Sequence, residues 1–227
     1  MSPHHFAAHR DDFTVSASTT DFELLDAWRD GDRSAGSELF SRHFGSVYGF
    51  FRSKLEHAAE DLTQQTFLNC VEARDDFRGA GSFRTYLFVV ARNVLYGHLR
   101  RRGNKAVDVD FEVTSIADLD VSPSTWLGFR EDHKLLVHAL RRLPLELQVA
   151  LELYYVQRMR APALATVLGI PAGTVRSRIR RGIEQLRLGM SDLVASPQRI
   201  RTTLTDLNRW AAELRVATPP ARMGAGR

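Results

Sequence analysis

The stretch ALATVLGIPAGTVRSRIRR, residues 163–181, decides the fold of the second half of the chain. Its pattern indicates a short apolar helix, a tight turn at Gly169 and a second, basic helix. At about 100° per residue, the apolar positions of the second helix share one side and most of its arginines share the other. Such a helix can bury one face on its partners and present the other to the major groove of DNA. The sequence therefore predicts a helix-turn-helix.

The polar side of the second helix is expected to contact DNA. Arginine can bind guanine through two hydrogen bonds, and it also neutralises phosphates. The residues expected to contact DNA are Thr174, Arg176, Ser177, Arg180 and Arg181. The residues expected to pack on the protein are Val175, Ile179, Gly182 and Leu186. A solvated basic helix is the alternative, but the turn, the preceding helix and the one-sided arginine cluster occur together.

The composition of the chain is that of a folded globular protein. Of its 227 residues, 44% are hydrophobic and 26% are charged, and the formal net charge is +4. The single cysteine, Cys70, excludes an internal disulfide and favours a reducing cytoplasm. No apolar run approaches the roughly 20 residues of a membrane helix. Residues 1–20 are polar and contain histidines, so we expect a disordered leader there and not a secretory signal.

Helical periodicity extends over most of the chain, and strand signals are nearly absent, so the predicted fold is all-α. Four helices are expected in the first half, at about 21–29, 33–55, 59–76 and 83–102. Thr20 and Glu23 have the spacing of a capping box at the start of the first helix, and Gly31 is expected to end it. Ser82 can cap the fourth helix.

The predicted organisation is two small helical domains with a linker between them. Residues 103–130 are acidic and contain Ser-Pro-Ser at 122–124, which is typical of a flexible linker. Helices resume near Glu131, and Pro144 is expected to begin a new one that extends to about Gln157. The expected parts are a leader (1–20), a first domain (21–102), the linker (103–130), a second domain (131–189) and a C-terminal extension (190–227).

The extension is expected to contain one amphipathic helix at about 197–215. Its apolar positions, which include Leu204, Leu207 and Trp210, share one face. We favour packing of this face on the protein's own domains. The alternative is that it regulates polymerase access or receives a partner.

Five short motifs follow one another in the first half of the chain: DLTQQTF at 61–67, FRG at 77–79, FRTYL at 83–87, ARN at 91–93 and RRR at 100–102. In this order they resemble region 2 of the sigma-70 family, in its extracytoplasmic-function (ECF) branch. Leu143-Pro144 and the helix-turn-helix are similar to region 4 of the same branch. The resemblance covers about 21–102 and 131–188, and two matches in the right order are highly specific.

The resemblance implies an RNA polymerase sigma factor, which binds core polymerase, recognises the −35 and −10 promoter elements and promotes DNA opening. The DLTQQTF helix would bind the clamp coiled coil of the large polymerase subunit, and region 4 would bind the −35 element and contact the other large subunit. The expected clamp-binding residues are Asp61, Leu62, Gln64 and Gln65. The residues expected to bind the −10 element are Arg78, Ser82, Tyr86, Arg92, Asn93, Tyr96, Arg100 and Arg101.

Purely structural roles remain open as alternatives for several of these residues. Tyr86 and Tyr96 are equally consistent with packing in the core, and the segment from Arg78 to Ser82 with a plain turn. The resemblance implies that acidic linker residues would mimic nucleic acid in a positive channel of the polymerase, whereas the alternative is a merely soluble linker. These acidic residues are Asp108, Asp110, Glu112, Asp118 and Asp120.

Three positions depart from the family's usual pattern. Gln65 stands where an acidic residue is usual, and Gly97 stands where an Asp is usual. In the family, the first helix of the helix-turn-helix usually opens with Ser-Tyr and a Glu pair, whereas residues 160–163 here are Arg-Ala-Pro-Ala. The usual cap of this helix is therefore lost, although proline is tolerated in a first turn. These departures affect the details of polymerase and DNA contact and leave the predicted fold unchanged.

Two other classes of function fit the sequence less well. A helix-turn-helix repressor or activator that acts without replacing sigma would leave the DLTQQTF and ARN motifs unexplained. An enzyme is disfavoured because the sequence contains no P-loop, zinc-ligand spacing, nucleophile elbow or Gly-rich dinucleotide turn. We therefore expect no catalytic residues, cofactor or metal. The expected partners are core RNA polymerase and promoter DNA, and the family's usual further partner is an anti-sigma factor, which no residue here identifies.

Overall fold

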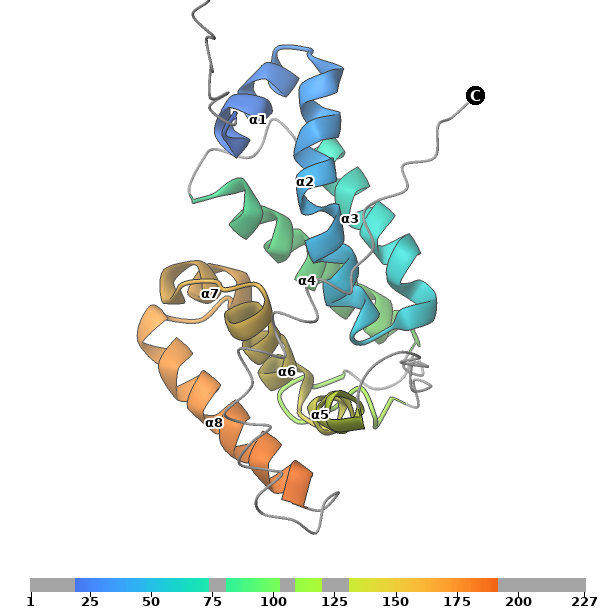
Figure 1. The fold of residues 1–227 in the computed structure, drawn as a ribbon, viewed down its shortest axis with the longest axis vertical. Coiled ribbons are helices and arrows are strands. Elements are labelled where there is room, and N and C mark those ends of the chain that lie inside the picture. Colours follow the sequence, from blue (N-terminus) through green and yellow to red (C-terminus); the bar gives the residue numbers. More distant parts are fainter. Residues whose placement is uncertain (1–18, 74–80, 103–108, 120–130, 192–227) are drawn as a thin grey trace, which may run out of the picture.

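The computed structural model describes residues 19–73, 81–102, 109–119 and 131–191. Within these ranges the regular elements are helical, apart from one isolated bridge between Ser115 and Pro144, so the all-α prediction is confirmed. Arg78, the leader and the predicted C-terminal helix lie outside the described residues. The helices (Figure 1) are α1 (Asp21–Arg29), α2 (Arg33–Arg52), η1 (Glu56–Ala58), α3 (Ala59–Glu72), α4 (Phe83–Arg102), α5 (Glu131–Arg141), α6 (Leu145–Leu151), η2 (Glu152–Val156), α7 (Ala161–Leu168) and α8 (Ala172–Ser191).

The predicted helix signals in the first half act as expected. Thr20 Oγ1 accepts from the Glu23 amide at 3.3 Å, and the Glu23 carboxylate accepts from the Thr20 amide at 2.6 Å, which completes the capping box. Gly31 follows α1 with φ 105°, a conformation that favours glycine. Ser82 Oγ accepts from the Thr85 amide at 3.2 Å at the start of α4. Local side-chain chemistry therefore sets where these helices begin and end.

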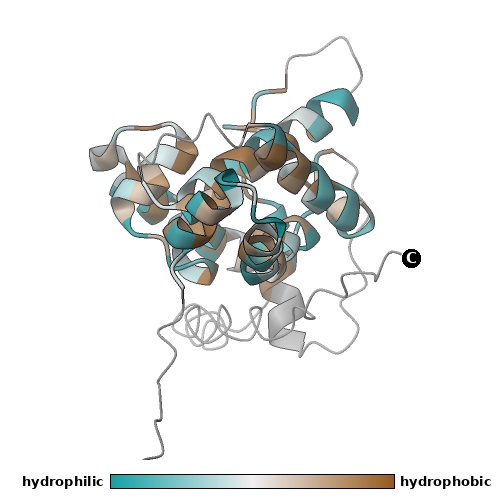
Figure 2. Ribbon diagram, turned by 90° about the horizontal axis from the view of Figure 1, so that it is seen from above, coloured by the Kyte–Doolittle hydropathy of each residue, from teal (hydrophilic) through white to brown (hydrophobic). Residues whose placement is uncertain are grey.

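Aromatic rings fill the core of the first domain, which consists of α1 to α4. The Trp28 and Phe40 rings meet edge to face at 5.1 Å, and the Phe40 and Phe67 rings lie 4.8 Å apart. Gly36 permits the approach of α1 to α2, because a Cβ atom there would lie 2.6 Å from the Trp28 ring. The hydrophobic faces of the helices are turned toward one another (Figure 2). This packing holds α3 and α4 in place, and these two helices carry most of the residues predicted to be functional.

Helix α6 forms the centre of the second domain, which consists of α5 to α8. All seven of its residues are buried, because α5, α7, α8 and residues 111–114 pack around it. Pro144 precedes it at the N-cap, as the sequence predicts. The helix then widens into a π-helix over Glu152–Val156, in which the Gln157 amide donates to the Glu152 carbonyl at 3.0 Å. This five-residue spacing is the mark of a π-helix, and such turns recur at functional sites.

Part of the linker is attached to the second domain, a local difference from the flexible linker expected. The side chains of Phe111 and Ile116 are buried, with 5% and 0% exposed. The Leu145 amide donates to the Thr114 carbonyl at 3.0 Å, and the Glu146 amide donates to the Phe111 carbonyl at 3.2 Å. The acidic composition of the segment favoured a flexible linker, although these two apolar side chains anchor it to the second domain. Residues 109–119 therefore belong structurally to the second domain.

The two domains pack directly against each other. Helix α4 lies between α2 and α3 on one side and α7 on the other (Figure 1). Polar bonds also cross the boundary: Arg141 Nη1 donates to the Lys54 carbonyl at 3.0 Å, and Arg84 Nη2 donates to Gln157 Oε1 at 2.8 Å. As a result, α4 is buried around most of its circumference.

Candidate nucleic-acid interface

The predicted helix-turn-helix forms from α7 and α8. Gly169 ends α7 in the left-handed conformation (φ 67°), and the Ile170 amide donates to the Ala165 carbonyl at 3.1 Å, as in a glycine-terminated helix. Arg160 stands at the N-cap of α7 without a side-chain capping bond, with Pro162 in the first turn. The loss of the usual cap at this position is therefore confirmed.

Helix α8 separates its apolar residues from most of its arginines, as the sequence predicts. The four residues predicted to pack on the protein are buried, together with Met190: Val175, Ile179, Gly182 and Leu186. The five residues predicted to contact DNA are all exposed: Thr174, Arg176, Ser177, Arg180 and Arg181. Arg178 differs from its neighbours: its side chain is 11% exposed and binds carboxylates on α6 and on the linker. One face of α8 is thus open, and the arginine between Arg176 and Arg180 is turned inward.

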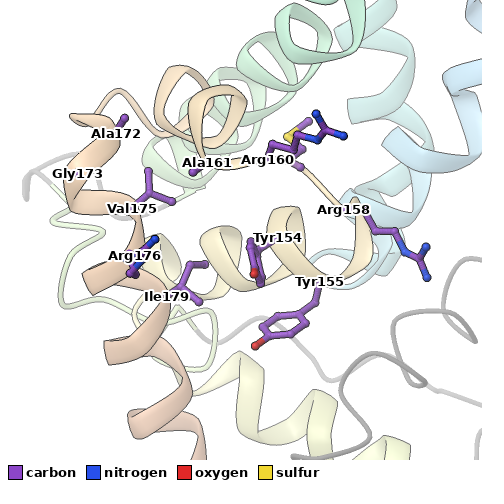
Figure 3. Close-up of a pocket in the computed structure, with 11 residues that line it drawn as sticks. Tyr154, Tyr155, Arg158, Arg160, Ala161, Ala172, Gly173, Val175, Arg176 and Ile179 are labelled. Atoms are coloured by element: carbon purple, nitrogen blue, oxygen red, sulfur yellow. The ribbon is translucent and has the colours of Figure 1, made fainter.

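A groove of about 820 Å³ lies beside α8 (Figure 3). One wall is the first half of α8, and the other is the segment from Tyr154 to Ala161 that connects α6 to α7. Arg158 and Arg160 on this segment are exposed and line the same groove as Arg176. Arg158 has φ 50°, a left-handed backbone that costs a non-glycine residue about 1 kcal/mol. We did not assign these two arginines from the sequence, although the pattern RMR at 158–160 was an available signal.

The predicted −10 residues of α4 fall into two groups. Asn93, Arg100 and Arg101 are exposed, whereas Tyr96 is 5% exposed and Arg92 has an 18% exposed side chain. Burial raises the pKa of the Tyr96 hydroxyl, so the hydroxyl stays protonated as a donor. The packing alternative for Tyr96 therefore describes this state of the molecule, although the residue also contacts a carboxylate through its hydroxyl and a guanidinium through its ring.

The remaining two −10 candidates on the described residues have local roles. Tyr86 is half-buried against the core of the first domain, and its ring centroid lies 6.4 Å from that of Phe83. Ser82 caps α4 with its hydroxyl, which also contacts Thr85 Oγ1 at 2.9 Å. Both side chains thus make packing or capping contacts at the start of α4.

Glu146 collects three donors from both domains. Arg92 Nη2 donates to Glu146 Oε1 at 2.9 Å, and the Tyr96 hydroxyl donates to the same oxygen at 3.2 Å. Arg178 Nη1 binds the other oxygen, Oε2, and Arg178 Nη2 reaches Glu112 Oε1 at 3.3 Å. The carboxylate therefore links the face of α4 to the middle of α8.

Phe111 of the linker lies on the same face of α4. Its ring centroid is 4.4 Å from that of Tyr96, with the planes inclined at 39°. The guanidinium carbon of Arg100 lies 5.3 Å from the Phe111 centroid, and that of Arg92 lies 4.5 Å from the Tyr96 centroid. Two arginines and two rings thus form one cluster in which cations face aromatic rings.

The predicted clamp-binding residues lie on α3, and three of them are exposed: Asp61, Gln64 and Gln65. Gln65 Nε2 donates to Asn69 Oδ1 at 2.7 Å, one turn further on. Leu62 requires a correction. Its side chain is 5% exposed and belongs to the core, because position 62 faces inward when 61, 64 and 65 face outward. Leu62 therefore packs in the core beneath the exposed face of α3.

Two apolar residues extend this surface of α3 and were not assigned from the sequence. Leu68 is 55% exposed and Val71 is 45% exposed, one to two turns after Gln64. Val71 lies in the last turn of α3, which ends at Glu72, and its side of that turn faces solvent. The spacing 61, 64, 65, 68 was the available signal, because it places these residues on one helical face.

Two absences concern the described part of the chain. Within residues 19–73, 81–102, 109–119 and 131–191, no three His, Cys, Asp or Glu side chains are grouped so as to hold a metal ion. Over the same residues, no helix has the length and apolar character needed to cross a membrane.

Comparison with known families follows the two domains. The family model described as Sigma-70 region 2 matches residues 39–105, and that described as Sigma-70, region 4 matches residues 133–186. An ECF RNA polymerase sigma factor, SigE of Mycolicibacterium smegmatis, is 32% identical over 79% of this chain and 74% of its own length. The chain belongs to the ECF branch of the sigma-70 family.

Other relatives of this ECF sigma factor agree. The RNA polymerase sigma-H factor of Pseudomonas aeruginosa is 29% identical over 77% of this chain and 95% of its own length. The solved structure of CnrH in complex with the cytosolic domain of CnrY has a similar fold, with a TM-score of 0.55, 23% identity, and coverage of 76% of this chain and 97% of that one. The ECF chain is an RNA polymerase sigma factor.

Proposed function

We propose that this sigma factor divides its work among three surfaces: α3 binds core RNA polymerase, α8 binds the −35 promoter element and α4 binds and opens the −10 element. The proposed functional domains are residues 21–102 and 131–189. The observation that carries the proposal is the one-sided distribution of arginines on α8, beside a tight glycine turn. We expect the protein to act with cytoplasmic polymerase and to have no catalysis of its own.

The polymerase-binding surface is supported by its mixed chemistry. Asp61, Gln64 and Gln65 supply a carboxylate and two amides, and Leu68 supplies an exposed apolar side chain beside them. Apolar anchors surrounded by polar groups are typical of the centre of protein interfaces. Because Gln65 replaces the family's usual acidic residue, this position contributes hydrogen bonds and no charge.

The −35 surface is supported by charge and shape. Arg176 and Arg180 project from the exposed face of α8, and Ser177 lies between them. Arginines placed in this way can read guanine edges and neutralise phosphates. Arg158 and Arg160 add two cations beside the same face, and we assign them to phosphate contacts on the flank of the element.

The −10 surface is supported by the combination of cations, an amide and an aromatic ring on α4. A separated strand exposes unstacked bases, which aromatic and arginine side chains bind by stacking while other cations bind the phosphates. Asn93, Arg100 and Arg101 are exposed on this surface, and Tyr96 lies beside them. Arg78 belongs to the same proposal and lies outside the described residues.

Run-off transcription tests the proposal. Purified protein, bacterial core polymerase and DNA from upstream of the protein's own gene are combined, and a protein-dependent transcript of defined length is expected. An Arg176→Ala/Arg180→Ala variant should lose the transcript and keep its affinity for core polymerase, whereas Arg142→Ala, which removes an exposed arginine outside the helix-turn-helix, should initiate normally. Sequence-specific DNA binding by the free protein without any transcript would instead favour a repressor.

A further inference from the structure

We propose that residues 110–112 and Glu146 mask the −10 surface of α4 by standing in for an unstacked DNA strand. They form one side of a groove whose other side includes Arg92, Asn93 and Arg100, all of them assigned above to −10 binding. This inference rests on that assignment. It adds that the free protein covers Tyr96 and Arg92 of this surface with its own chain.

Phe111 occupies the place of a base. Its ring lies 4.4 Å from the Tyr96 ring and 5.3 Å from the Arg100 guanidinium, so it is held between an aromatic ring and a cation. A nucleobase stacked on a binding protein has the same neighbours, because stacking and cation–π contact need only a flat π-face. With 5% of its surface exposed, Phe111 fills this position almost completely.

Carboxylates occupy the places of phosphates. Glu146 accepts from Arg92 Nη2 and from the Tyr96 hydroxyl, and it also binds Arg178. Glu112 accepts from Arg178 Nη2 at 3.3 Å, and Asp110 lines the same groove. Arginine binds carboxylate and phosphate oxygens through the same planar donors. Among the cations assigned to −10 binding, Arg92 is therefore already satisfied by a carboxylate of the chain itself.

The polar lining distinguishes a mimic from an ordinary core contact. A buried phenylalanine normally packs against aliphatic and aromatic side chains, and Ile116 of the same segment, with no exposed surface, belongs to that kind of core. Phe111 is also buried in the core, but in addition it lines a groove together with two arginines, an asparagine and carboxylates. Its next-but-one neighbour Val113 is 69% exposed, so the segment does not simply bury its apolar residues.

The mask is attached to the second domain. Backbone hydrogen bonds join Phe111 to Glu146 at 3.2 Å and Thr114 to Leu145 at 3.0 Å. Separation of the second domain from α4 would therefore withdraw Phe111 and Glu146 together. Tyr96 and Arg92 would become free when the two domains move apart, and they are covered while the domains are packed.

Binding of single-stranded DNA by the full chain tests the mask. The probe is a fluorescein-labelled 12-nucleotide strand of mixed sequence, followed by anisotropy at low salt. Phe111→Ala should bind the probe about tenfold more tightly than the unmodified protein, which is the size of one stacking contact. Glu112→Gln should bind severalfold more tightly, because it removes a negative charge from the lining of the groove without removing an apolar anchor. Val113→Ala, an exposed change in the same segment, is the matched control and should bind as the unmodified protein does.

A second readout keeps the test independent of folding defects. Hydrogen exchange of the Leu145 and Glu146 amides reports on their bonds to Thr114 and Phe111. Excess probe should speed their exchange in the unmodified protein, because the strand displaces the segment. Folded variants that bind no more tightly, together with exchange that the probe leaves unchanged, would overturn the mask.

The two proposals can fail separately. Transcription by the unmodified protein with no tightening in the variants would leave the function standing and reject the mask. Tighter binding in the variants without any transcript would support the mask and reject the function.

Discussion

Lys54 and Glu152 form an ion pair at the junction of the two domains, and almost none of either side chain reaches solvent. The Lys54 side chain is 0% exposed and that of Glu152 is 5% exposed. Lys54 Nζ also donates to the Phe50 carbonyl at 2.7 Å, and Gln148 Nε2 donates to Glu152 at 3.1 Å. Burial lowers the pKa of Lys54, and the carboxylate opposes that shift.

Removal of the carboxylate alone should therefore be costly. Glu152→Ala leaves a buried ammonium without its counter-ion, and we expect a loss of about 3–5 kcal/mol in the free energy of unfolding, measured with urea. Glu184→Ala, at an exposed position of α8, should change it by less than about 0.5 kcal/mol. The double change Lys54→Met/Glu152→Leu should recover most of the loss, because it removes both charges. Equal effects of Glu152→Ala and Glu184→Ala would contradict a stabilising ion pair.

The exposed arginines of α8 should control the salt dependence of promoter binding. With duplex DNA of the −35 element and the polymerase holoenzyme, Arg180→Ala should reduce the slope of log affinity against log salt by about 1, since one phosphate contact is lost. Arg142→Ala should leave the slope unchanged. A slope that Arg180→Ala does not alter would place the DNA on another face of the domain.

The surface of α3 should decide affinity for core polymerase. We expect Gln64→Ala/Leu68→Ala to weaken binding about tenfold or more in a competition assay, because the change removes a hydrogen-bonding amide and an exposed apolar contact. Ser37→Ala, on the exposed side of α2, is the control. Normal competition by a variant with an unchanged melting temperature would remove α3 from the interface.

The cysteine should be unreactive in the folded protein. Burial raises the pKa of the Cys70 thiol to about 12, so almost no thiolate exists at pH 8. A thiol reagent such as dithionitrobenzoate should react with the native protein at the rate of unfolding and with the urea-unfolded protein at once. Fast reaction of the native protein would mean that α3 opens locally.

Two glycines should respond to alanine in opposite directions. Gly36→Ala should destabilise the protein by about 1–3 kcal/mol, because the new Cβ would lie 2.6 Å from the Trp28 ring. Gly189→Ala should stabilise it by about 0.5 kcal/mol, because nothing lies within 4 Å of that position and alanine favours the helix. Thermal melts of the two variants compare the effects, and a stabilised Gly36→Ala variant would contradict the tight contact between α1 and α2.

The sequence predicted those features that depend on local chemistry and periodicity. Thr20, Gly31 and Gly169 act at helix ends, where side chains or backbone conformation decide the outcome without distant partners. The two faces of α8 follow from the helical period. These signals lie within a few residues of one another, so they can be recognised before the fold is known.

The remaining features depend on contacts between distant residues. Tyr96 is buried because Phe111 and Glu146, 15 and 50 positions away, cover it, and no local pattern encodes that contact. The burial of Lys54 depends on Glu152 in the same way. Leu62 was expected to bind polymerase from its motif, whereas its position relative to Asp61 and Gln64 turns it toward the core.

The position of Arg178 has a thermodynamic consequence for the whole molecule. Glu146 binds Arg178 of α8 with one oxygen and Arg92 of α4 with the other. If duplex DNA at α8 draws Arg178 away from this carboxylate, Glu146 keeps only Arg92 and Tyr96 of α4 as partners, and the free energy of its contact with α4 changes. Reciprocity then requires that strand binding at α4 change the affinity of α8 for its element by the same factor. One glutamate would thus couple the two halves of a promoter.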